Sequence, residues 1–482
     1  MAIFRIACIA ALYLGPIFYI FPWAQDRSND RNIAGPLVGH ATASTVSMWM
    51  FASAASKISV RYIPTDGKGA EEQAEFSAAT MPAERISGQP FKATLTDLRP
   101  QTEYRYFVAV DGKFERSHKG TFQTAPEKGA ATRFRVGLTS CMKIGMPQGS
   151  WKLFLSEEPT FHLTLGDTHY ANSTDPNTQW IHHLRYRRTS NFAAVIASMP
   201  TYAIWDDHDY GPNNSDGTLK GKERSLESWK SVWANPAAGT TIIPGAFFRF
   251  AWGDVDFFVL DGRFHRSPNK AKDDYKKRML GDPQFEWLLN GLKHSKAKFK
   301  VLASGSTLHH SKADDSWRTF TFARHRLFDA IRKHKISGVV YFSGNIHDSL
   351  VWTHHESARV GYPLVEVISS GITQGETRSF ATVDFDTTVA DPTMRVRILY
   401  GDGEIYVDQI WRLSQLEVTD SPDIPFSTDI PKLQRRFSET ESKLFRLRIH
   451  RRDLLKRYAE KHPDVIDIDR RIRIIKQQTI TP

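Results

Sequence analysis

The sequence predicts a mixed α/β core that follows an all-β domain and precedes a charged helical tail. Across residues 132–415, short apolar runs end repeatedly in polar residues and alternate with helix-like segments, which is typical of α/β folds. Residues 33–127 instead contain strand-like runs separated by Asp-Gly turns, as all-β domains do. After a proline-containing linker at 416–431, residues 432–482 carry leucines at helical spacing among many charges. These three sequence patterns define the expected domain boundaries.

Length and cysteine content limit the class of protein. A chain of 482 residues is too long for one ordinary core, and 40% hydrophobic residues is a globular composition. The two cysteines, Cys8 and Cys141, form no disulfide framework. Cys8 lies in an apolar N-terminal run, so Cys141 is the single thiol of the folded body. A lone thiol there needs either a chemical role or deep burial.

The net charge of +11 is concentrated in the tail. Residues 432–482 hold fifteen lysines and arginines against seven acidic residues, so the tail carries a surplus of eight. Charge confined to a tail, without an accompanying motif, predicts no nucleic-acid partner for the body. The tail is either a solvated or coiled helix, or a helix that contacts an anionic membrane or an acidic polymer.

The N-terminus contains an apolar stretch. Residues 6–24 are nineteen residues without a charge, long enough to cross a bilayer as a helix, and Arg5 supplies a positive flank. We predict a signal peptide or a membrane anchor within residues 1–25, with a buried helix of the soluble body as the alternative. Aromatic residues stand where a cleavage site needs small ones, which favours the anchor. Either export signal predicts a periplasmic or other extracytoplasmic location.

One pattern in the all-β part resembles the corner between strands E and F of an immunoglobulin-like or fibronectin type III-like sandwich. In that corner, a tyrosine hydroxyl is bonded to the backbone a few residues upstream. The residues that carry the pattern are Phe91, Leu95, Leu98, Pro100, Thr102 and Tyr104. The pattern indicates a fold rather than a chemistry, so we expect this domain to be a spacer or a rim beside a site.

The α/β part contains six strand-like runs and at least two helix-like segments between them. The expected strands are 134–138, 161–165, 203–205, 255–260, 299–303 and 339–342, and the expected helices include 180–197 and 283–292. Because open α/β sheets bind ligands at the carboxyl ends of their strands, the polar residues after these runs mark the expected site.

Those polar residues have the chemistry of metal ligands. Thiolate, phenolate, carboxylate and imidazole together suit a trivalent ion such as iron, whereas carboxylates and carboxamides suit calcium, magnesium or manganese. Two neighbouring ions would share a carboxylate, and Asp167 is the natural bridge. The residues at the strand ends are Cys141, Asp167, Tyr170, Asp206, Asp207, His208, Asn213, Asn345 and His347. A satisfied structural polar group is the alternative for each.

Four motifs in this order resemble the alkaline phosphatase D family, the PhoD-like metallophosphoesterases. The motifs are Ser-Cys at 140–141, Gly-Asp-Thr-His-Tyr at 166–170, Trp-Asp-Asp-His-Asp at 205–209 and Ser-Gly-Asn-Ile-His at 343–347. The resemblance extends over about residues 35–415. It implies a four-layer αββα core behind a fibronectin-like domain, and hydrolysis of phosphate esters by a hydroxide activated at a dinuclear metal centre.

The resemblance also implies a role for each site residue. The implied metals are Fe³⁺ plus one or two divalent ions, Ca²⁺ or alternatively Mn²⁺ or Mg²⁺. The implied iron ligands are Cys141, Asp167, Tyr170 and His347, and the second site takes Asp207, Asn213 and Asn345. His208 matches the histidine that stabilises or protonates the leaving oxygen, and Arg263 matches a residue that pairs with phosphate oxygens.

One residue departs from the family pattern, which usually has aspartate where this chain has Asn345. The second site thereby lacks one negative charge, for which His309 and His310 either compensate or form a surface pair. Two other functions stay open, the first because of the basic tail and possible anchor, the second because of Asn345. One is a phosphodiesterase or phospholipase D-like enzyme that acts on anionic polymers or lipids. The other is a surface-binding protein with a degenerate site.

Overall fold

The computed structural model describes most of the two predicted domains. Its described residues are 33–54, 56–308, 315–375 and 378–419, with the short pieces 462–463, 466–468 and 470–471. The apolar run 6–24, nearly all of the linker and most of the basic tail lie outside them, so the expectations for these segments stay predictions. Within the described residues, no helix has both the length and the apolar character needed to span a bilayer.

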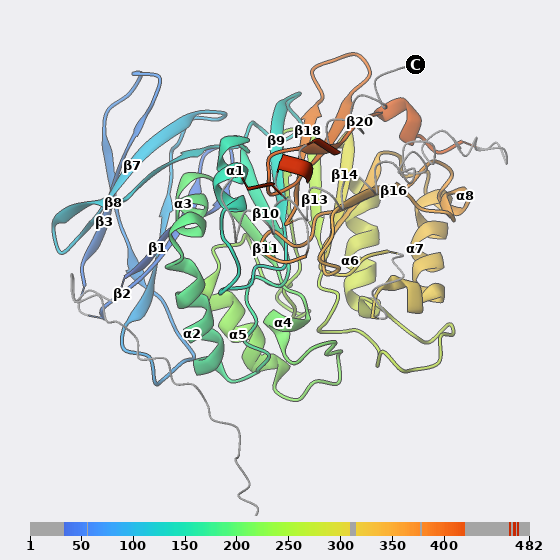
Figure 1. Cartoon of the computed structure of the whole chain (residues 1–482), viewed down its shortest axis with the longest axis horizontal. Helices are drawn as coiled ribbons and strands as arrows, with labels where there is room; N and C mark the ends of the chain where they lie inside the picture. The colour runs from blue at the N-terminus through green and yellow to red at the C-terminus, as the bar shows by residue number, and fades with distance from the viewer. Residues whose placement is uncertain are drawn as a thin grey trace, which may run out of the picture.

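The N-terminal domain consists of two four-stranded antiparallel sheets, seen at the left of Figure 1. The first sheet has the order β1 (Ala34–Ala41), β2 (Val46–Ala52), β6 (Gln89–Leu95) and β5 (Ser77–Ala78). The second has the order β4 (Glu72–Glu75), β3 (Ile58–Pro64), β7 (Glu103–Val110) and β8 (Lys113–Gln123). The all-β texture predicted for this part is therefore present. The predicted corner bond is present too, since Tyr104 Oη accepts a hydrogen bond from the Arg99 backbone nitrogen at 2.9 Å.

Side chains of the N-terminal domain are bonded directly to the α/β part. Trp49 Nε1 on β2 donates to the carbonyl of Ser231 at 3.0 Å, and Tyr106 Oη on β7 donates to the carbonyl of Ala197 at 2.7 Å. Both aromatic side chains are fully buried, so each bond satisfies a polar group that would otherwise be left unpaired in the interior. The two parts thus share one packed interface.

The α/β part contains two six-stranded mixed sheets. One has the order β11 (Thr201–Ile204), β10 (Phe161–Leu165), β9 (Arg133–Thr139), β18 (Phe380–Asp386), β19 (Thr393–Leu399) and β20 (Ile405–Arg412). The other has the order β12 (Phe248–Trp252), β13 (Val255–Val259), β14 (Phe299–Ala303), β15 (Val339–Ser343), β17 (Val365–Ile368) and β16 (Leu350–Thr353). In the first sheet β11, β10 and β9 are parallel and β18, β19 and β20 antiparallel, and β11 lies at the edge. In the second sheet β13, β14, β15 and β17 are parallel, between the antiparallel edge strands β12 and β16.

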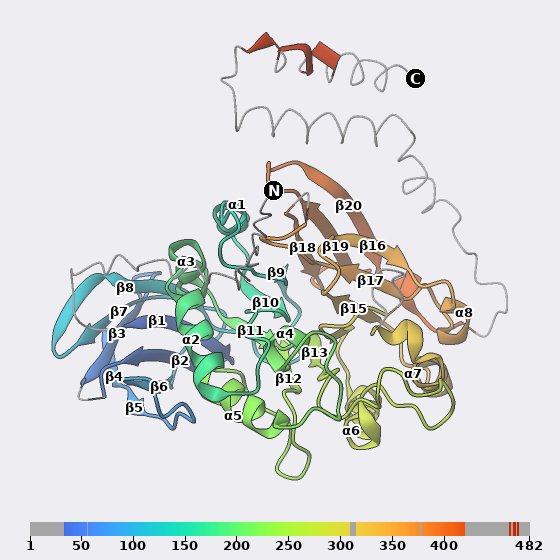
Figure 2. The ribbon, with the colours of Figure 1, turned by 60° about the horizontal axis from the view of Figure 1, so that its bottom comes forward.

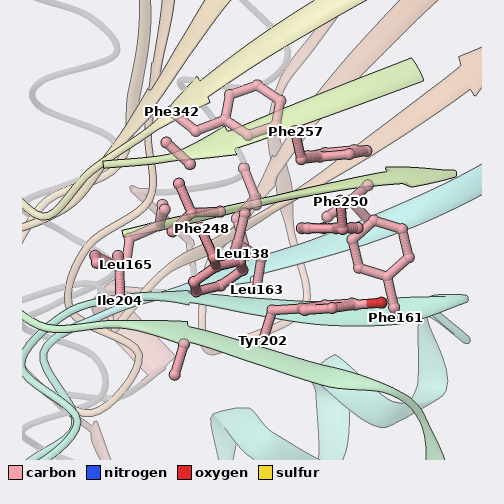
Figure 3. Close-up of a cluster of buried hydrophobic side chains, with 14 of the residues drawn as sticks. Leu138, Phe161, Leu163, Leu165, Tyr202, Ile204, Phe248, Phe250, Phe257 and Phe342 are labelled. Atoms are coloured by element: carbon pink, nitrogen blue, oxygen red, sulfur yellow. The ribbon is translucent and has the colours of Figure 1, made fainter. Parts of the chain in front are cut away.

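Aromatic and aliphatic side chains fill the space between the two sheets (Figure 3). Phe161 of the first sheet lies 5.4 Å from Phe257 and 5.7 Å from Phe250 of the second, measured between ring centroids. The Tyr202 ring stacks on Phe250 at 3.9 Å. Edge-to-face and stacked pairs of this kind add to the burial of large apolar surfaces. This packing fixes the two sets of strand ends relative to each other.

Helices cover the outer faces of both sheets (Figure 1). They are α1 (Ser150–Ser156), α2 (Pro176–Arg187), α3 (Ser190–Ser198), α4 (Asp207–Tyr210), α5 (Lys222–Val232), α6 (Gly281–His294), α7 (Thr321–Lys333) and α8 (Ser357–Val360), with 3₁₀ turns at Trp317–Thr319 and Leu413–Leu416. On one side, Phe154 of α1 lies 5.1 Å from His162 of β10. On the other, Trp287 of α6 lies 6.1 Å from Phe258 of β13. The predicted mixed α/β class is confirmed.

Two details correct the expected helices and strands. The segment 180–197, predicted as one helix, forms α2 and α3, because Thr189 has an extended backbone that ends the first helix and precedes the second. A further strand that leads to the site, β17, was not predicted. The six predicted strands are present, with ends within two residues of those expected. Figure 2 shows β9, β10, β11, β15 and β17 in the central part of the molecule.

Candidate metal centre

The strand-end loops bring the predicted ligands together. Cys141 follows β9, Asp167 follows β10, Asp207 begins α4 directly after β11, and His347 follows β15. The possible ligand atoms of Cys141, Asp167 and His347 all lie within 4.8 Å of one another, as do those of Asp167, Asp207 and His208. Asp167 belongs to both groups, which is the position predicted for a bridging carboxylate.

The backbone at four predicted ligands is left-handed. The φ angle is +57° at Cys141, +52° at Asp167, +73° at Asn345 and +56° at His347. Side chains other than glycine rarely adopt this conformation, although asparagine and aspartate tolerate it best. Such strain persists where the surrounding structure enforces it, and it gathers at functional sites. The loops therefore hold these side chains in positions that an unstrained strand end would not give.

The first ligand group is closely connected. Cys141 Sγ lies 3.4 Å from Asp167 Oδ2, and Tyr170 Oη donates to the same oxygen at 3.3 Å. Ser370 Oγ lies 3.2 Å from Cys141 Sγ and accepts a hydrogen bond from the His347 backbone nitrogen at 2.8 Å. All four predicted iron ligands thus meet at one point.

Two residues of this group were missed by sequence reasoning. Ser370 lies in the loop after β17, and Gln374 Nε2 in the same loop contacts Tyr170 Oη and the carbonyl of Cys141. The signal was present but interrupted, because β17 reads Val-Glu-Val-Ile and is followed by Ser369, Ser370 and a glycine, much as β15 ends in a serine followed by a glycine. A four-residue strand is too short to show a period.

The second predicted ligand set is only partly assembled. Asp207 Oδ2 accepts from the backbone nitrogen of Asn214 at 2.6 Å, whereas Asn213 lies exposed in the same loop. The amide nitrogen of Asn345 donates to Asp315 Oδ1 at 3.4 Å, which leaves its amide oxygen for another partner. His309 and His310, considered as compensating ligands, lie outside the described residues.

His208 lies at the half-buried side of the predicted ligand cluster, which we call the cage and which comprises Cys141, Asp167, Tyr170, Asp207, His208 and His347. The Nδ1 atom of His208 lies 2.5 Å from the amide oxygen of Asn172, an acceptor that keeps a proton on Nδ1. Its ring centroid lies 4.2 Å from that of Tyr170. Burial lowers the pKa of His208, and Arg263 adds to this, while Asp207 opposes it. A neutral ring leaves Nε2 to accept a proton or bind a cation.

Asp209 connects two of the strand-end loops. Its Oδ1 accepts from the backbone nitrogen of Thr168 at 2.9 Å and of His169 at 3.2 Å. Its Oδ2 accepts from the backbone nitrogen of Asp206 at 3.0 Å. The last acidic residue of the Trp-Asp-Asp-His-Asp motif therefore positions the loop that carries Asp167, a role the sequence did not assign.

Arg263 lies away from solvent, in a cluster of carboxylates. Its side chain is 0% exposed, with Nε 2.5 Å from Asp206 Oδ1 and Nη1 2.6 Å from Asp315 Oδ2. Nη2 lies 3.8 Å from Asp207 Oδ1. Burial pushes the pKa of Asp315 upward, but Arg263 and Arg266 outweigh it and lower the value to about 2. The predicted contact of Arg263 with phosphate stays a prediction that this environment does not favour.

Without a cation beside them, the anionic forms of the buried ligands are disfavoured. Burial raises the pKa of Asp167 well above its ordinary value, and the neighbouring Cys141 and Asp207 raise it further. Burial also raises the pKa of Cys141. Within the described residues, no hydrogen bond reaches Asp167 Oδ1 or Asp207 Oδ1, although both atoms are buried. Such groups need a compensating cation, so thiolate, carboxylate and imidazole here fit a metal centre.

The paired sheets, with two overlapping ligand groups at their strand ends, have the architecture of metallophosphoesterases. Residues 136–409 match the PhoD-like phosphatase family. Because this match covers more than half of the chain, the chain belongs to that family, and the resemblance drawn from the four motifs is confirmed.

Individual relatives show how far the similarity extends. Alkaline phosphatase D of Bacillus subtilis (strain 168) is 26% identical over 200 residues, which are 35% of this chain and 34% of that protein. The chain thus spans about a third of the curated relative that it matches. A solved structure of PhoD has a TM-score of 0.63 at 15% identity, covering 88% of this chain and 98% of that one. Purple acid phosphatase PPD1 from yellow lupin seeds has a TM-score of 0.60 at 14% identity, over 80% and 75%. These structures show a shared fold.

Proposed function

We propose that the protein hydrolyses phosphate esters at a centre of two metal ions. The observation that carries this proposal is the position of Asp167 in both ligand groups. A carboxylate shared by two sites suits a pair of ions a few ångströms apart, the arrangement used for in-line displacement at phosphorus. Membership of the PhoD-like phosphatase family supports the same reaction.

The two ligand groups suit different ions. Cys141, Asp167, Tyr170 and His347 would hold Fe³⁺, because three anionic ligands compensate a trivalent charge. Asp207 would join Asp167 at a divalent ion, with calcium the first candidate and the amide oxygens of asparagines as neutral ligands. When bound, such ions activate water as a nucleophile and neutralise charge on the phosphorus oxygens.

The chain's own residues then position the reacting groups. Asn172 fixes the tautomer of His208, so Nε2 is the nitrogen that would carry a proton to the leaving alcohol. That role needs the charged imidazole, which burial disfavours and a bound phosphate anion would favour. Asp209 keeps Asp167 in place, and the buried Arg263 fixes Asp206 beside Asp207.

The first test compares two esters on the same protein. Full-length protein in mild detergent, loaded with iron and calcium or manganese, is expected to hydrolyse p-nitrophenyl phosphate, and a chelator is expected to abolish this activity. Bis(p-nitrophenyl) phosphate is the second substrate, because a preference for it would indicate a phosphodiesterase. Metal analysis of the same samples shows whether loading succeeded.

The outcomes separate the remaining functions. Turnover that a chelator leaves unchanged would overturn the metal-dependent reaction. A metal-loaded protein that hydrolyses neither ester would favour a degenerate binding site. The hydrogen bond of Asn345 uses its amide nitrogen, and its amide oxygen would serve calcium as a neutral ligand, which argues against that last outcome.

We also propose that the basic tail brings the enzyme to an anionic surface or polymer. The charge surplus of residues 432–482 supports this, at about 1 kcal/mol for each basic residue near such a surface. Deleting 432–482 is expected to reduce activity on vesicles or polymers that carry phosphate esters, with activity on p-nitrophenyl phosphate retained. An equal effect on both substrates would contradict a targeting role.

Three further features complete the proposal. Export by the apolar run 6–24 would place the enzyme outside the cytoplasm, and the mass of the exported protein would show whether this run is cleaved.

The corner bond at Tyr104 supports a fibronectin type III-like identity for the N-terminal domain. Helices on the outer faces of both sheets support the four-layer αββα arrangement. A crystal structure of the loaded protein would test both assignments.

A further inference from the structure

The cage has one side that solvent reaches. His347 is exposed and both Tyr170 and His208 are half-buried, whereas Cys141 and Asp167 are buried. A phosphate ester must therefore approach from the side of the two histidines and the tyrosine. Any protein cation that meets the peripheral oxygens of the ester has to stand at this rim.

Lys143 stands at that rim on a fixed backbone. Its backbone nitrogen donates to Thr373 Oγ1 at 2.7 Å, and its carbonyl accepts from the same hydroxyl at 3.3 Å and from Gln148 Nε2 at 3.2 Å. The preceding nitrogen, that of Met142, donates to the carbonyl of Asp167 at 2.9 Å. The backbone of Lys143 is thereby joined to the loop of the central ligand, while its side chain is exposed.

The ammonium group lies near the groups that face the substrate. Lys143 Nζ is 5.8 Å from the centroid of the Tyr170 ring, which itself lies 4.2 Å from the His208 ring. Its positive charge is among those that lower the pKa of His208, after burial, Arg263 and His347. In the described part of the chain, no ion pair joins Lys143 to a carboxylate. A cation–π contact at an exposed site is weak and leaves the side chain able to turn to a stronger partner.

Arg263, another cation close to the cage, is engaged elsewhere. Arg263, which the sequence favoured for phosphate binding, is fully buried and paired with Asp206 and Asp315. To reach a phosphate it would have to leave two carboxylates unpaired in the interior, which is costly. Lys143 has no such bonds to break.

We infer that Lys143 is a specificity-determining residue, which pairs with the peripheral oxygens of the bound ester and favours phosphomonoesters. A phosphate monoester is a dianion at neutral pH, whereas a diester is a monoanion, because one more of its oxygens is esterified. After both ester types have reached the metal ions, the monoester has one more charged oxygen for an ammonium group to meet. This inference rests on the proposed phosphoesterase function.

The test uses three variants of the full-length, metal-loaded protein. Lys143→Met removes the charge, Lys143→Arg keeps it, and Lys128→Met removes an equally exposed lysine that precedes β9, at the opposite end of the strand that leads to Cys141. For each protein, KM and kcat are measured with p-nitrophenyl phosphate and with bis(p-nitrophenyl) phosphate. Calorimetry with inorganic phosphate gives a dissociation constant without any turnover.

We expect Lys143→Met to raise KM for the monoester and the dissociation constant of phosphate by about tenfold, the size of one hydrogen bond to a charged group. The diester KM should rise by less than about threefold, and kcat should change little. Lys143→Arg should restore most of the loss, and Lys128→Met should behave as the unaltered protein.

Two results would overturn the inference. One is an equal loss on both esters, which would mean that Lys143 supports the cage rather than the choice of substrate. The other is phosphate binding that Lys143→Met leaves unchanged. The calorimetric measurement decides even when neither ester is hydrolysed, so failure of the proposed reaction and failure of this inference remain distinct results.

Discussion

Replacing Asp167 with asparagine is expected to remove both the metal ions and the turnover. The side chain contributes ligand atoms to both groups, so losing its charge weakens both ions at once. Loss of residues that only support metal ligands costs about 10–100-fold in affinity or activity, so loss of a shared ligand should exceed 100-fold. Asparagine also tolerates the left-handed backbone at this position, so the loop itself should keep its shape. Metal content by elemental analysis and turnover of p-nitrophenyl phosphate measure the result.

A second measurement separates this effect from simple unfolding. In the metal-free state, a buried carboxylate beside Cys141 and Asp207 is repelled, so the metal-free Asp167→Asn variant should unfold at the same or a higher temperature than the metal-free parent. Metal should raise the unfolding temperature of the parent only. Asp254→Asn is the control, because Asp254 is also a buried carboxylate but precedes β13, at the end of that strand away from the site. The Asp254→Asn variant should retain the metal ions. Full metal retention by Asp167→Asn would disprove the shared-ligand role.

The part of the site that the sequence predicted is the part encoded next to strand ends. Cys141, Asp167 and His347 could be found because each comes shortly after a strand-like run, and the carboxyl ends of parallel strands share one edge. The strands themselves were predictable for the same reason, since a buried strand is a continuous apolar run. At these residues the local sequence pattern, a strand followed by polar residues, was sufficient to predict their place at the edge of the sheet.

The partners of these residues were not predictable, because they depend on contacts between distant segments. Asp315 precedes a 3₁₀ turn, and nothing near it in the sequence indicates that it meets Arg263, which follows β13. Arg263 was assigned to phosphate because an arginine near a phosphate site usually serves that purpose. In the structure Arg263 is buried and paired with carboxylates instead. Burial depends on how the whole interior packs, so a motif does not reveal it.

Replacing Arg263 with methionine is expected to destabilise the fold more than it alters substrate binding. The change leaves Asp206 and Asp315 buried without their partner, and breaking a buried ion pair in this way costs about 3–5 kcal/mol. Arg359→Met is the control, since Arg359 also makes two bonds to carboxylate oxygens, both of Asp329, at 3.0 and 2.8 Å, but on the surface. Its side chain is 41% exposed, and an exposed pair contributes at most about 1 kcal/mol.

Urea unfolding of the two variants and the parent gives the difference in stability, and the KM for p-nitrophenyl phosphate is measured under conditions where each variant is folded. If Arg263 held substrate phosphate, its loss would raise KM and leave the urea midpoint near that of the parent. If it holds the carboxylates, the midpoint falls while KM stays close to the parent value. The second result would place the phosphate-binding charge at the solvent-facing rim, because a buried cation that neutralises Asp206 and Asp315 has no charge left to offer an incoming dianion.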